Sequence, residues 1–424
     1  MRLLIQSLNY APDEIGIPKY STEMAEWFAQ KGWAVHVVTA PPYYPHWRVG
    51  QGYRAWSYSR EMRKDVSLLR CPLYVPSSPN GLKRLLHLAS YAATSGPAVL
   101  AEALSYRPDA IVAVAPDLMA APAAALAAKL TGAASFLHVQ DFELDLALQM
   151  GMIRRKSFAR VLAGMERSFL RAFDHASAPS PAMVSQLRTR GVLPERAFIF
   201  RNWCDTGIIR PDIDPSVYRR DWAVGENDVV LLYSGSLSEK QGVMTLAEAA
   251  RCLVSQSHIH FVICGAGPAK QKLAHAVQDL GNVRLLPLQP AELLPELLCA
   301  ADIHLLPQIP AAADLVLPSK LAGMLASGRP VIATALPGSG IAHEIANAGI
   351  IAPPGDVNAL CEAIMCLAAN QPMRDLLRGN ARQRAETHWS KDVILSEFET
   401  RVVEAVGAKR VANRAKRAVR IRVR

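Results

Sequence analysis

The sequence lacks several features that mark particular classes of protein. It contains seven cysteines, an odd number, and no two of them form a CxxC pair. Several lie within apolar runs, where a cysteine behaves as a small hydrophobic residue, so we expect a protein of the reducing cytosol. No repeat at the spacing of solenoid proteins is present either.

Long uninterrupted apolar segments are also missing. Residues 1–6 become polar too early for a signal peptide, and the apolar stretch 110–130 contains Asp117 and two prolines. Because neither segment suits a transmembrane helix, we expect a chain without a leader or a membrane span.

Acidic residues are absent from residues 408–424, which hold eight of the 47 lysines and arginines of the chain. The remainder has 39 basic and 37 acidic residues, so most of the net charge of +10 belongs to this end. A nearly neutral body does not favour binding of nucleic acid. The basic end suits either contact with phosphates and anionic lipid or a disordered, solubilising tail, and the sequence leaves both open.

Short apolar runs that end at glycine or proline are abundant, and they alternate with helical patterns. Runs of this length suit the strands of a parallel sheet that is covered on both faces. We therefore predict an α/β protein with two Rossmann-like, doubly wound parallel-sheet domains that face a cleft. The predicted strands are residues 3–7, 34–39, 111–115, 135–139, 175–178 and 197–200, and then 229–233, 259–264, 283–286, 303–306, 330–333 and 350–352.

The hinge between the domains is predicted near residues 202–224, which contain two prolines and little periodicity. The predicted parts are an N-terminal domain of residues 1–205, a C-terminal domain of residues 206–390, a helix over 391–407 that packs back on the N-terminal domain, and a disordered basic tail over 408–424.

Loops rich in small residues follow the strands of the second half, at the edge where doubly wound sheets bind ligands. The loop with Gly235 and Lys240 opens a helix and suits a diphosphate, although a capped loop with a solvent-exposed lysine has the same pattern. Lys320 stands in the first turn of a helix, where a cation is unfavourable unless an anion lies nearby. The loop at Gly267 is not a dinucleotide fingerprint, because Lys270 replaces the third glycine, so it suits a base, a ribose or a simple turn.

In the first half, His138 and Asp141 leave the strand 135–139 at its carboxyl end. An imidazole and a carboxylate at such an edge suit catalysis, and a structural histidine is the alternative. Two further segments, residues 82–88 and 152–173, are amphipathic and basic. They suit the surface of an anionic bilayer, or else a solvated face above an ordinary core stripe.

Several motifs together resemble those of one known family. They are residues 8–12 (LNYAP), 16–20 (GIPKY), 39–45 (TAPPYYP), 137–141 (LHVQD), 201–203 (RNW), 235–242 (GSLSEKQG) and 317–321 (LPSKL). The chain is similar to retaining glycosyltransferases of family GT4, which have the GT-B fold, and among them to bacterial exopolysaccharide enzymes of the colanic acid type.

This resemblance implies a nucleotide-diphosphate sugar as donor, held by the C-terminal half, with GDP-fucose as the favoured guess. It also implies a lipid-linked saccharide as acceptor, no metal or other cofactor, and a peripheral position on the cytoplasmic face of an anionic membrane. By position, Gly16, Gly267, Leu288 and His138 match functional positions of the family, and Lys240 stands one residue before the usual phosphate-binding lysine. Together with the residues singled out above from the sequence itself, they form two groups. The predicted donor-binding residues are Gly16, Gly235, Lys240, Gly267, Leu288, Ser319 and Lys320, and the predicted catalytic residues are His138 and Asp141.

Two features depart from the family pattern. The usual pair of glutamates would fall near Leu315 and Gly323, and neither residue is acidic, while Ser236 stands where an arginine is common. The ribose and the charge of the diphosphate must then be bound differently. A nucleotide-sugar epimerase of the same fold, or a non-catalytic sugar-nucleotide-binding partner in a polysaccharide assembly complex, remain as alternatives.

Overall fold

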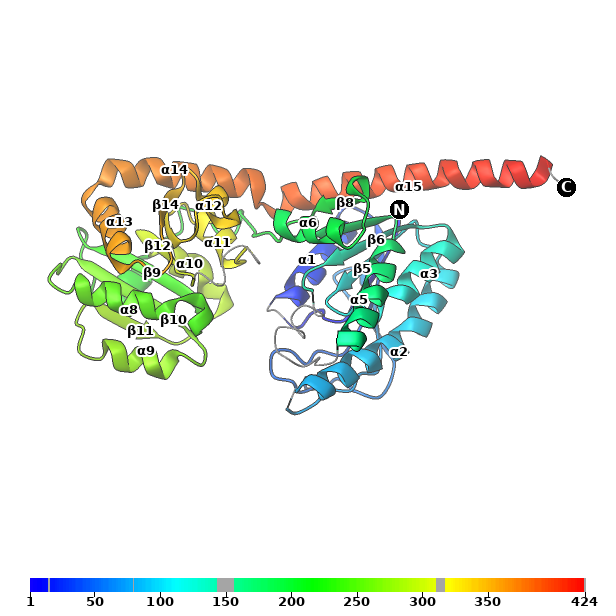
Figure 1. Ribbon diagram of the computed structural model, residues 1–424, viewed down its shortest axis with the longest axis horizontal. Helices are drawn as coiled ribbons and strands as arrows, with labels where there is room; N and C mark the ends of the chain where they lie inside the picture. Colours follow the sequence, from blue (N-terminus) through cyan, green and yellow to red (C-terminus); the bar gives the residue numbers. More distant parts are fainter. Residues whose placement is uncertain (14–15, 79, 143–155, 310–316, 423–424) are drawn as a thin grey trace. The chain divides into compact units, whose positions relative to one another are not determined.

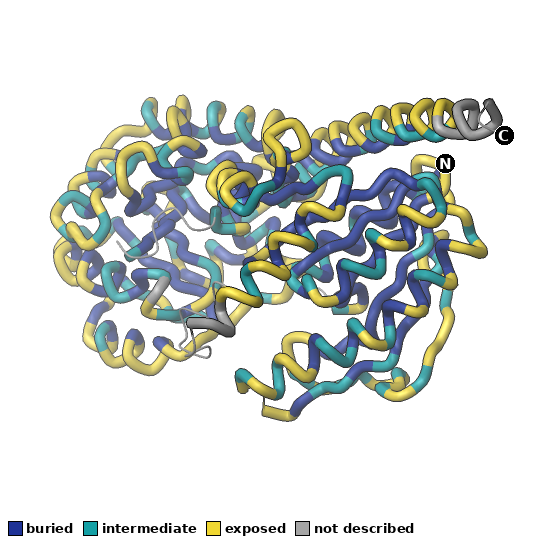
Figure 2. Tube along the Cα trace, turned by 45° about the vertical axis from the view of Figure 1, so that its right-hand side comes forward, coloured by how far each residue is buried: buried dark blue, intermediate teal, exposed yellow. Residues whose placement is uncertain are grey.

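The computed structural model describes residues 1–13, 16–78, 80–142, 156–309 and 317–422, and the chain divides into two compact units (Figure 1). Unit 1 comprises Met1–Arg201 together with Leu395–Arg424, and unit 2 comprises Asn202–Ile394. The central strands of both units are buried, and the exposed residues lie mainly on the helices, the loops and the edge strand β3 (Ser59–Arg63) (Figure 2).

Unit 1 contains, among its described residues, an eight-stranded sheet of order β3-β4-β2-β1-β5-β6-β7-β8. All neighbours pair in parallel except β3 and β4, which form an antiparallel pair at one edge. The order reverses between β1 and β5, as in a doubly wound sheet. The strands are β1 (Arg2–Ser7), β2 (Ala34–Thr39), β3 (Ser59–Arg63), β4 (Val66–Arg70), β5 (Ala110–Ala115), β6 (Ala134–Val139), β7 (His175–Ala178) and β8 (Ala197–Ile199).

Two helices of unit 1 begin at residues whose side chains cap the helix. Asn80 accepts a hydrogen bond from Lys83 N at 3.1 Å, and Ser180 accepts one from Met183 N at 3.2 Å, which satisfies backbone donors that have no partner inside the helix. No helix in the described part of the chain is both long enough and apolar enough to cross a bilayer. The helices are α1 (Ile17–Gln30), α2 (Gly81–Tyr106), α3 (Ala121–Thr131), α5 (Lys156–Arg171), α6 (Pro181–Thr189) and the short η1 (Pro194–Arg196).

Unit 2 contains a six-stranded parallel sheet, within the described residues, of order β11-β10-β9-β12-β13-β14. Alternate residues of β9 enter two different cores, with Val230 and Leu232 on one face and Leu231 and Tyr233 on the other. A strand that is buried on both faces must be apolar throughout, and β9 is therefore easily recognised in the sequence as an apolar run. The strands are β9 (Val229–Ser236), β10 (Ile259–Ala266), β11 (Val283–Leu286), β12 (Ile303–Leu306), β13 (Val331–Thr334) and β14 (Gly349–Ala352).

The helices of unit 2 cover both faces of this sheet, so the predicted pair of doubly wound sheets is confirmed. They are α7 (Ser216–Asp221), α8 (Val243–Cys252), α9 (Lys270–Val277), α10 (Leu294–Cys299), α11 (Lys320–Ala326), α12 (Gly340–Ile345), α13 (Val357–Ala369) and α14 (Gln371–His388), with the short η2 (Glu239–Gln241) and η3 (Ala291–Leu293).

Helix α15 (Lys391–Arg422) starts in unit 2 and packs along unit 1. The Phe398 ring lies among aromatic side chains of unit 1, with centroid distances of 4.2 Å to Phe200, 5.6 Å to Phe136 and 6.1 Å to Phe28. Trp33 Nε1 donates to Glu399 Oε1 at 2.7 Å. The last helix is therefore part of the core of unit 1.

The expectation of a disordered tail over residues 408–424 was wrong for the part that is described, because α15 continues to Arg422. Lys409 pairs with Asp174 at 2.6 Å, Arg410 pairs with Asp109 at 2.7 Å, and Asn413 Nδ2 donates to Gly132 O at 3.1 Å. These side chains find acceptors on unit 1, and the sequence alone does not show such partners.

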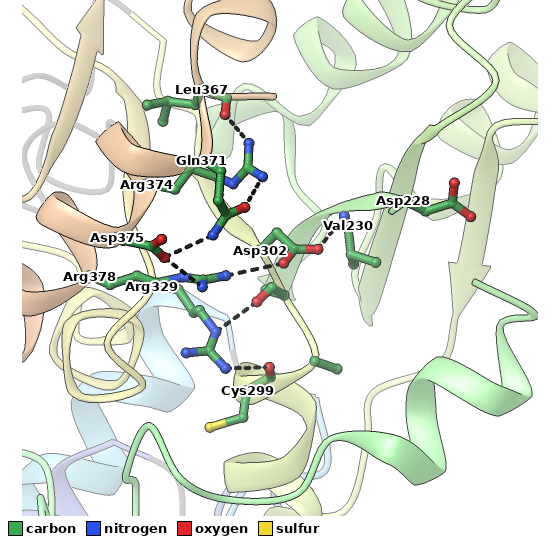
Figure 3. Close-up of polar contacts among 12 residues, drawn as sticks. Asp228, Val230, Cys299, Asp302, Arg329, Leu367, Gln371, Arg374, Asp375 and Arg378 are labelled. Atoms are coloured by element: carbon green, nitrogen blue, oxygen red, sulfur yellow. Dashed lines mark hydrogen bonds and ion pairs between the residues drawn. The ribbon is translucent and has the colours of Figure 1, made fainter. Parts of the chain in front are cut away.

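At the amino edge of the unit 2 sheet, the carboxylate of Asp302 accepts hydrogen bonds from several donors (Figure 3). Asp302, directly before β12, accepts hydrogen bonds from Val230 N at 2.9 Å, Arg219 Nη1 at 2.9 Å and Arg378 Nη2 at 3.2 Å. The Asp302 carboxylate thus links the strands β9 and β12 with the helices α7 and α14.

Arginines at this edge also bind the carbonyl groups at helix ends. Arg329 donates to Ala301 O at 2.9 Å and to Cys299 O at 3.0 Å, at the end of α10 (Figure 3). Arg382 donates to Ala326 O at 2.9 Å, at the end of α11. The last carbonyls of a helix have no partner inside it and carry partial negative charge, so guanidinium groups stabilise them.

Candidate functional site

The loops after β9 and β10 pack together at the carboxyl edge of the unit 2 sheet. Leu237 N donates to Ala266 O at 2.9 Å, and Ala269 N donates to Leu237 O at 2.9 Å. A Cβ at Gly267 would lie 2.3 Å from Leu237 O, and the φ of Gly267 is +153°, so a side chain is excluded there. Gly267, predicted near the base, therefore has a structural role in joining the two loops.

Lys320, the first residue of α11, lies beside the turn at Gly235. A Cβ at Gly235 would lie 3.5 Å from Lys320 Cδ and 3.6 Å from its Nζ. The Lys320 Nζ stands 4.0 Å from the centroid of the Tyr233 ring. The structure therefore brings together two of the predicted donor-binding residues.

The electrostatics of Lys320 are unusual for a lysine. Its Nζ is buried and has no hydrogen-bond partner among the described residues. Burial lowers the pKa of this amine to about 7, because desolvation disfavours the charged form and no carboxylate of the described segments offsets it. A buried cation normally has a partner, so this amine is suited to an anionic ligand.

This place is the topological switch point of unit 2, where β9 neighbours β12 and the strand order reverses. Thr334 Oγ1 accepts from Gln308 N at 2.7 Å and donates to Gln308 O at 2.9 Å, which fixes the loop after β12. A Cβ at Gly242 would lie 3.2 Å from the Gln308 carbonyl carbon. Ligands of doubly wound sheets bind at this position.

The other predicted donor-binding residues of unit 2 have fewer defined contacts than Lys320 and Gly235. Ser319 is exposed and caps α11 without a side-chain hydrogen bond in the described structure. Leu288, 55% exposed, follows the edge strand β11. Lys240 lies in η2, and its side chain is outside the described part of the molecule.

Of the two positions where the family's glutamate pair would fall, the structure describes only one. Leu315 lies outside the described residues. At Gly323, inside α11, an added Cβ would lie 3.2 Å from Leu298 Cδ1 and 3.6 Å from Ile209 Cδ1. A glutamate here would point toward the apolar core rather than toward a ligand.

His138, near the end of β6, is buried and uses both ring nitrogens within unit 1. Its Nδ1 lies 3.0 Å from Ser177 Oγ, and its Nε2 lies 2.8 Å from Gln140 Nε2. Since the amide can only donate to Nε2, the ring is neutral with its proton on Nδ1. Burial lowers the pKa of His138 to about 3, which keeps it neutral. Its predicted catalytic role stays a prediction.

Asp141 and Gly16 both lie at the carboxyl edge of unit 1 and are exposed. Gly16 precedes α1 with a φ of +78°, and an added Cβ would meet no atom within 4 Å. Its backbone is therefore open to a close approach from outside the unit. Asp117 follows β5 and is buried, its Oδ2 has no hydrogen-bond partner in the described structure, and burial raises its pKa to about 7.

Comparison with known proteins shows the family to which the chain belongs. Residues 16–203 match the glycosyl transferase 4-like domain, and residues 228–370 match the glycosyl transferases group 1 domain. An Escherichia coli (strain K12) protein named as a colanic acid biosynthesis glycosyl transferase, WcaI, is 41% identical over 342 residues, which cover 79% of this chain and 83% of that protein. The chain belongs to this glycosyltransferase family.

Further relatives of the glycosyltransferase match more distantly. The amylovoran biosynthesis glycosyltransferase AmsK of Erwinia amylovora is 30% identical over 170 residues, which cover 38% of this chain and 42% of that protein. Sucrose-phosphate synthase from Thermosynechococcus elongatus has a TM-score of 0.72 at 16% identity, covering 96% of this chain and 100% of that one. Anabaena HepE in complex with UDP has a TM-score of 0.68 at 17% identity, covering 95% and 100%. The predicted GT-B fold class is thereby confirmed.

Sequence reasoning missed three side chains of the glycosyltransferase that shape these edges. Tyr233 ends an apolar run and resembled a core residue, and the signal for it was a hydroxyl directly before the Gly235 turn. Asp117 was noted only as an interruption, although an acidic residue after a buried strand marks a carboxyl edge. Thr334 gave no signal, because its role depends on the neighbouring loop.

Proposed function

We propose that this enzyme transfers a sugar, with retention of configuration, from a nucleotide-diphosphate donor to a lipid-linked oligosaccharide in exopolysaccharide biosynthesis. The relatives named for colanic acid and amylovoran biosynthesis support the polysaccharide pathway. The distantly similar HepE structures contain UDP or UDP-glucose, which supports the donor class. GDP-fucose is the donor that we favour.

The observation that carries this proposal is the amine of Lys320 beside Gly235 at the switch point of unit 2, which is buried and has no hydrogen-bond partner in the part of the chain that the structure describes. When the bond between the sugar and the diphosphate breaks, negative charge develops on the diphosphate. A fixed cation in a desolvated place stabilises that charge. The acceptor oxygen bonds to the sugar carbon, and its hydroxyl proton passes to the leaving diphosphate.

The remaining assignments belong to the same proposal. The backbone at Gly16, the loops at Gly235 and Gly267, and the side chain of Lys240 would contact the donor, with Leu288 and Ser319 at its periphery. No metal or other cofactor takes part. In the observed arrangement His138 would act as a positioning residue through Gln140, which its Nε2 binds, with Asp141 near the reacting sugar.

A peripheral position on the cytoplasmic face of the membrane is supported by the start of α2. Its outward stripe is apolar, with Leu82 69%, Leu85 48% and Leu86 51% exposed, while Leu88 is buried. Lys83 lies on the same first turns. An exposed apolar stripe next to a cation suits an anionic bilayer better than a solvated face does.

The donor site is tested by a transfer assay with a panel of nucleotide sugars and a lipid-linked acceptor. Lys320→Ala should lower kcat/KM at least about 100-fold while the protein stays folded. Arg251→Ala is the matched control, because it removes a cation of unit 2 that forms an exposed pair with Asp279. Wild-type turnover by Lys320→Ala would refute the site. Product formed without acceptor would indicate an epimerase, and binding without turnover a non-catalytic partner.

The membrane position is tested by sedimentation with vesicles that contain anionic lipid. The triple change Leu82→Ser, Leu85→Ser and Leu86→Ser should reduce vesicle binding about tenfold or more, because each leucine contributes buried apolar area. Leu376→Ser, at a residue 65% exposed on α14, is the control and should bind as the wild type does. Equal binding by all variants would contradict the assignment of this surface.

A further inference from the structure

Tyr233 contacts both the cation and the turn of the proposed diphosphate site. Its ring lies 4.0 Å from Lys320 Nζ, and its hydroxyl donates to Ser236 O at 2.6 Å. Burial raises the pKa of this phenol far above neutrality, so the hydroxyl keeps its proton and remains a donor. One fully buried side chain of β9 therefore links Lys320 to the backbone that carries Gly235.

Within residues 1–13, 16–78, 80–142, 156–309 and 317–422, few other groups hold the Lys320 amine. The titratable group that faces its Nζ from the described elements is Tyr233, and burial alone lowers the pKa of the amine to about 7. The aromatic face favours the charged form through its quadrupole, and this attraction is stronger in a desolvated place. The free amine and the ammonium therefore coexist near neutral pH when no anion is bound.

We propose that Tyr233 is a positioning residue that holds Lys320 and the Gly235 turn in register, and that a nucleotide sugar binding there takes up one proton at Lys320 Nζ. This rests on the proposed function of the site. The amine forms one N–H bond with a proton supplied by the buffer, and the resulting ammonium faces the negatively charged diphosphate. Binding should therefore weaken as pH rises, because more of the unliganded protein holds a free amine.

The test is calorimetric titration with UDP-glucose and with GDP-fucose, whose diphosphates do not titrate between pH 6 and 9. Measurements at pH 6 and pH 8, each in two buffers of different ionisation enthalpy, give the number of protons taken up. For the wild type we expect uptake close to one proton at pH 8 and little at pH 6. The Kd should be about tenfold higher at pH 8 than at pH 6, as a pKa near 7 requires.

Three variants separate the parts of the proposal. Lys320→Arg carries a permanent charge, so its Kd should be nearly independent of pH and its proton uptake should vanish. Tyr233→Leu removes the aromatic face and should raise the Kd at pH 8 about tenfold. Tyr233→Phe keeps the ring but loses the bond to Ser236 O, so it should retain the proton uptake of the wild type while its Kd rises about fivefold.

The outcomes distinguish this inference from the proposed function. If neither nucleotide sugar binds the wild type, or if Lys320→Ala binds as the wild type does, both fall. If binding needs Lys320 but no proton is taken up at pH 8, or if Tyr233→Leu matches the wild type in Kd and pH dependence, this inference alone is overturned. Thermal melting of each variant shows whether it is folded, and Tyr233→Phe tests the positioning role should Tyr233→Leu fail to fold.

Discussion

The two edges of the unit 2 sheet use positive charge in opposite ways. At the amino edge, Arg219 and Arg378 share the carboxylate of Asp302. Figure 3 shows the contact of Arg378 with Asp302 and that of Arg329 with carbonyls at the end of α10. At the carboxyl edge, the Lys320 amine is buried beside Gly235 without a hydrogen-bond partner in the described structure. Cations with acceptors stabilise the fold, whereas a buried amine without one costs stability.

Asp302→Ala should remove the shared hydrogen-bond acceptor at the amino edge of the unit 2 sheet and have the largest effect on stability. It leaves two guanidinium groups and Val230 N without their shared acceptor, so we expect a loss of about 3 kcal/mol in the free energy of unfolding. The midpoint of thermal unfolding of unit 2 should fall by roughly 9 °C.

The control is Asp279→Ala, which removes an exposed partner of Arg251 and should change stability by less than about 1 kcal/mol. Lys320→Ala should not show the loss of Asp302→Ala, because it removes an amine for which the described residues provide no hydrogen-bond partner. A melting temperature lowered equally by Lys320→Ala and Asp302→Ala would show that the two edges do not differ as described.

Gly267→Ala should disturb the carboxyl edge through its backbone. The new Cβ would lie 2.3 Å from Leu237 O at a φ of +153°, so the two loops must separate, at a cost of about 2 kcal/mol and with weaker nucleotide binding. Gly355→Ala is the control, because its φ is +82° but nothing lies within 4 Å of the added Cβ. Calorimetric Kd values and melting curves of both variants check this, and equal effects would argue against the contact between the loops.

Asp117→Asn extends the comparison to unit 1 and should have the smallest effect. Burial raises the pKa of Asp117 in the folded protein to about 7, above its value in the unfolded chain, so the folded state binds more protons. Stability is therefore lost as pH rises from about 4 to about 7. The variant should be more stable than the wild type at pH 8, by on the order of 1 kcal/mol, and equal to it near pH 4.

Denaturant unfolding at both pH values measures the difference for Asp117→Asn. The exposed Asp212→Asn, at a residue that pairs with Arg210 on the surface, should show no gain at pH 8. A gain for Asp117→Asn that is the same at pH 4 and pH 8 would contradict its assignment to a buried carboxyl group.

The sequence predicted the central strands of both sheets because their residues are buried on both faces. The predicted strand 303–306 coincides with β12 (Ile303–Leu306), and 259–264 falls within β10. The pair β3–β4 was missed, because β3 is an edge strand of mostly exposed, charged residues and shows no apolar run. The 26-residue extent of α2 was missed as well, since its interior contains Pro97.

The candidate site was predicted in its backbone more than in its side chains. The pairing of Lys320 with the Gly235 turn followed from strand order alone, since both lie at the carboxyl edge near the switch point. The contacts of Tyr233 and Thr334 depend on packing between loops that are far apart in the sequence. The contacts of His138 with Ser177 and Gln140 also depend on the fold, while its catalytic role stays a prediction.

The position of Phe398 has a consequence for how the molecule is made. A ribosome releases Phe28, Phe136 and Phe200 long before the residue that packs against all three of them. All strands of unit 2 have been synthesised by the time α15 leaves the ribosome. Unit 1, although its strands are synthesised earlier, still lacks the helix that covers part of its core. The half of the polypeptide that is translated first is thus the one that is completed last.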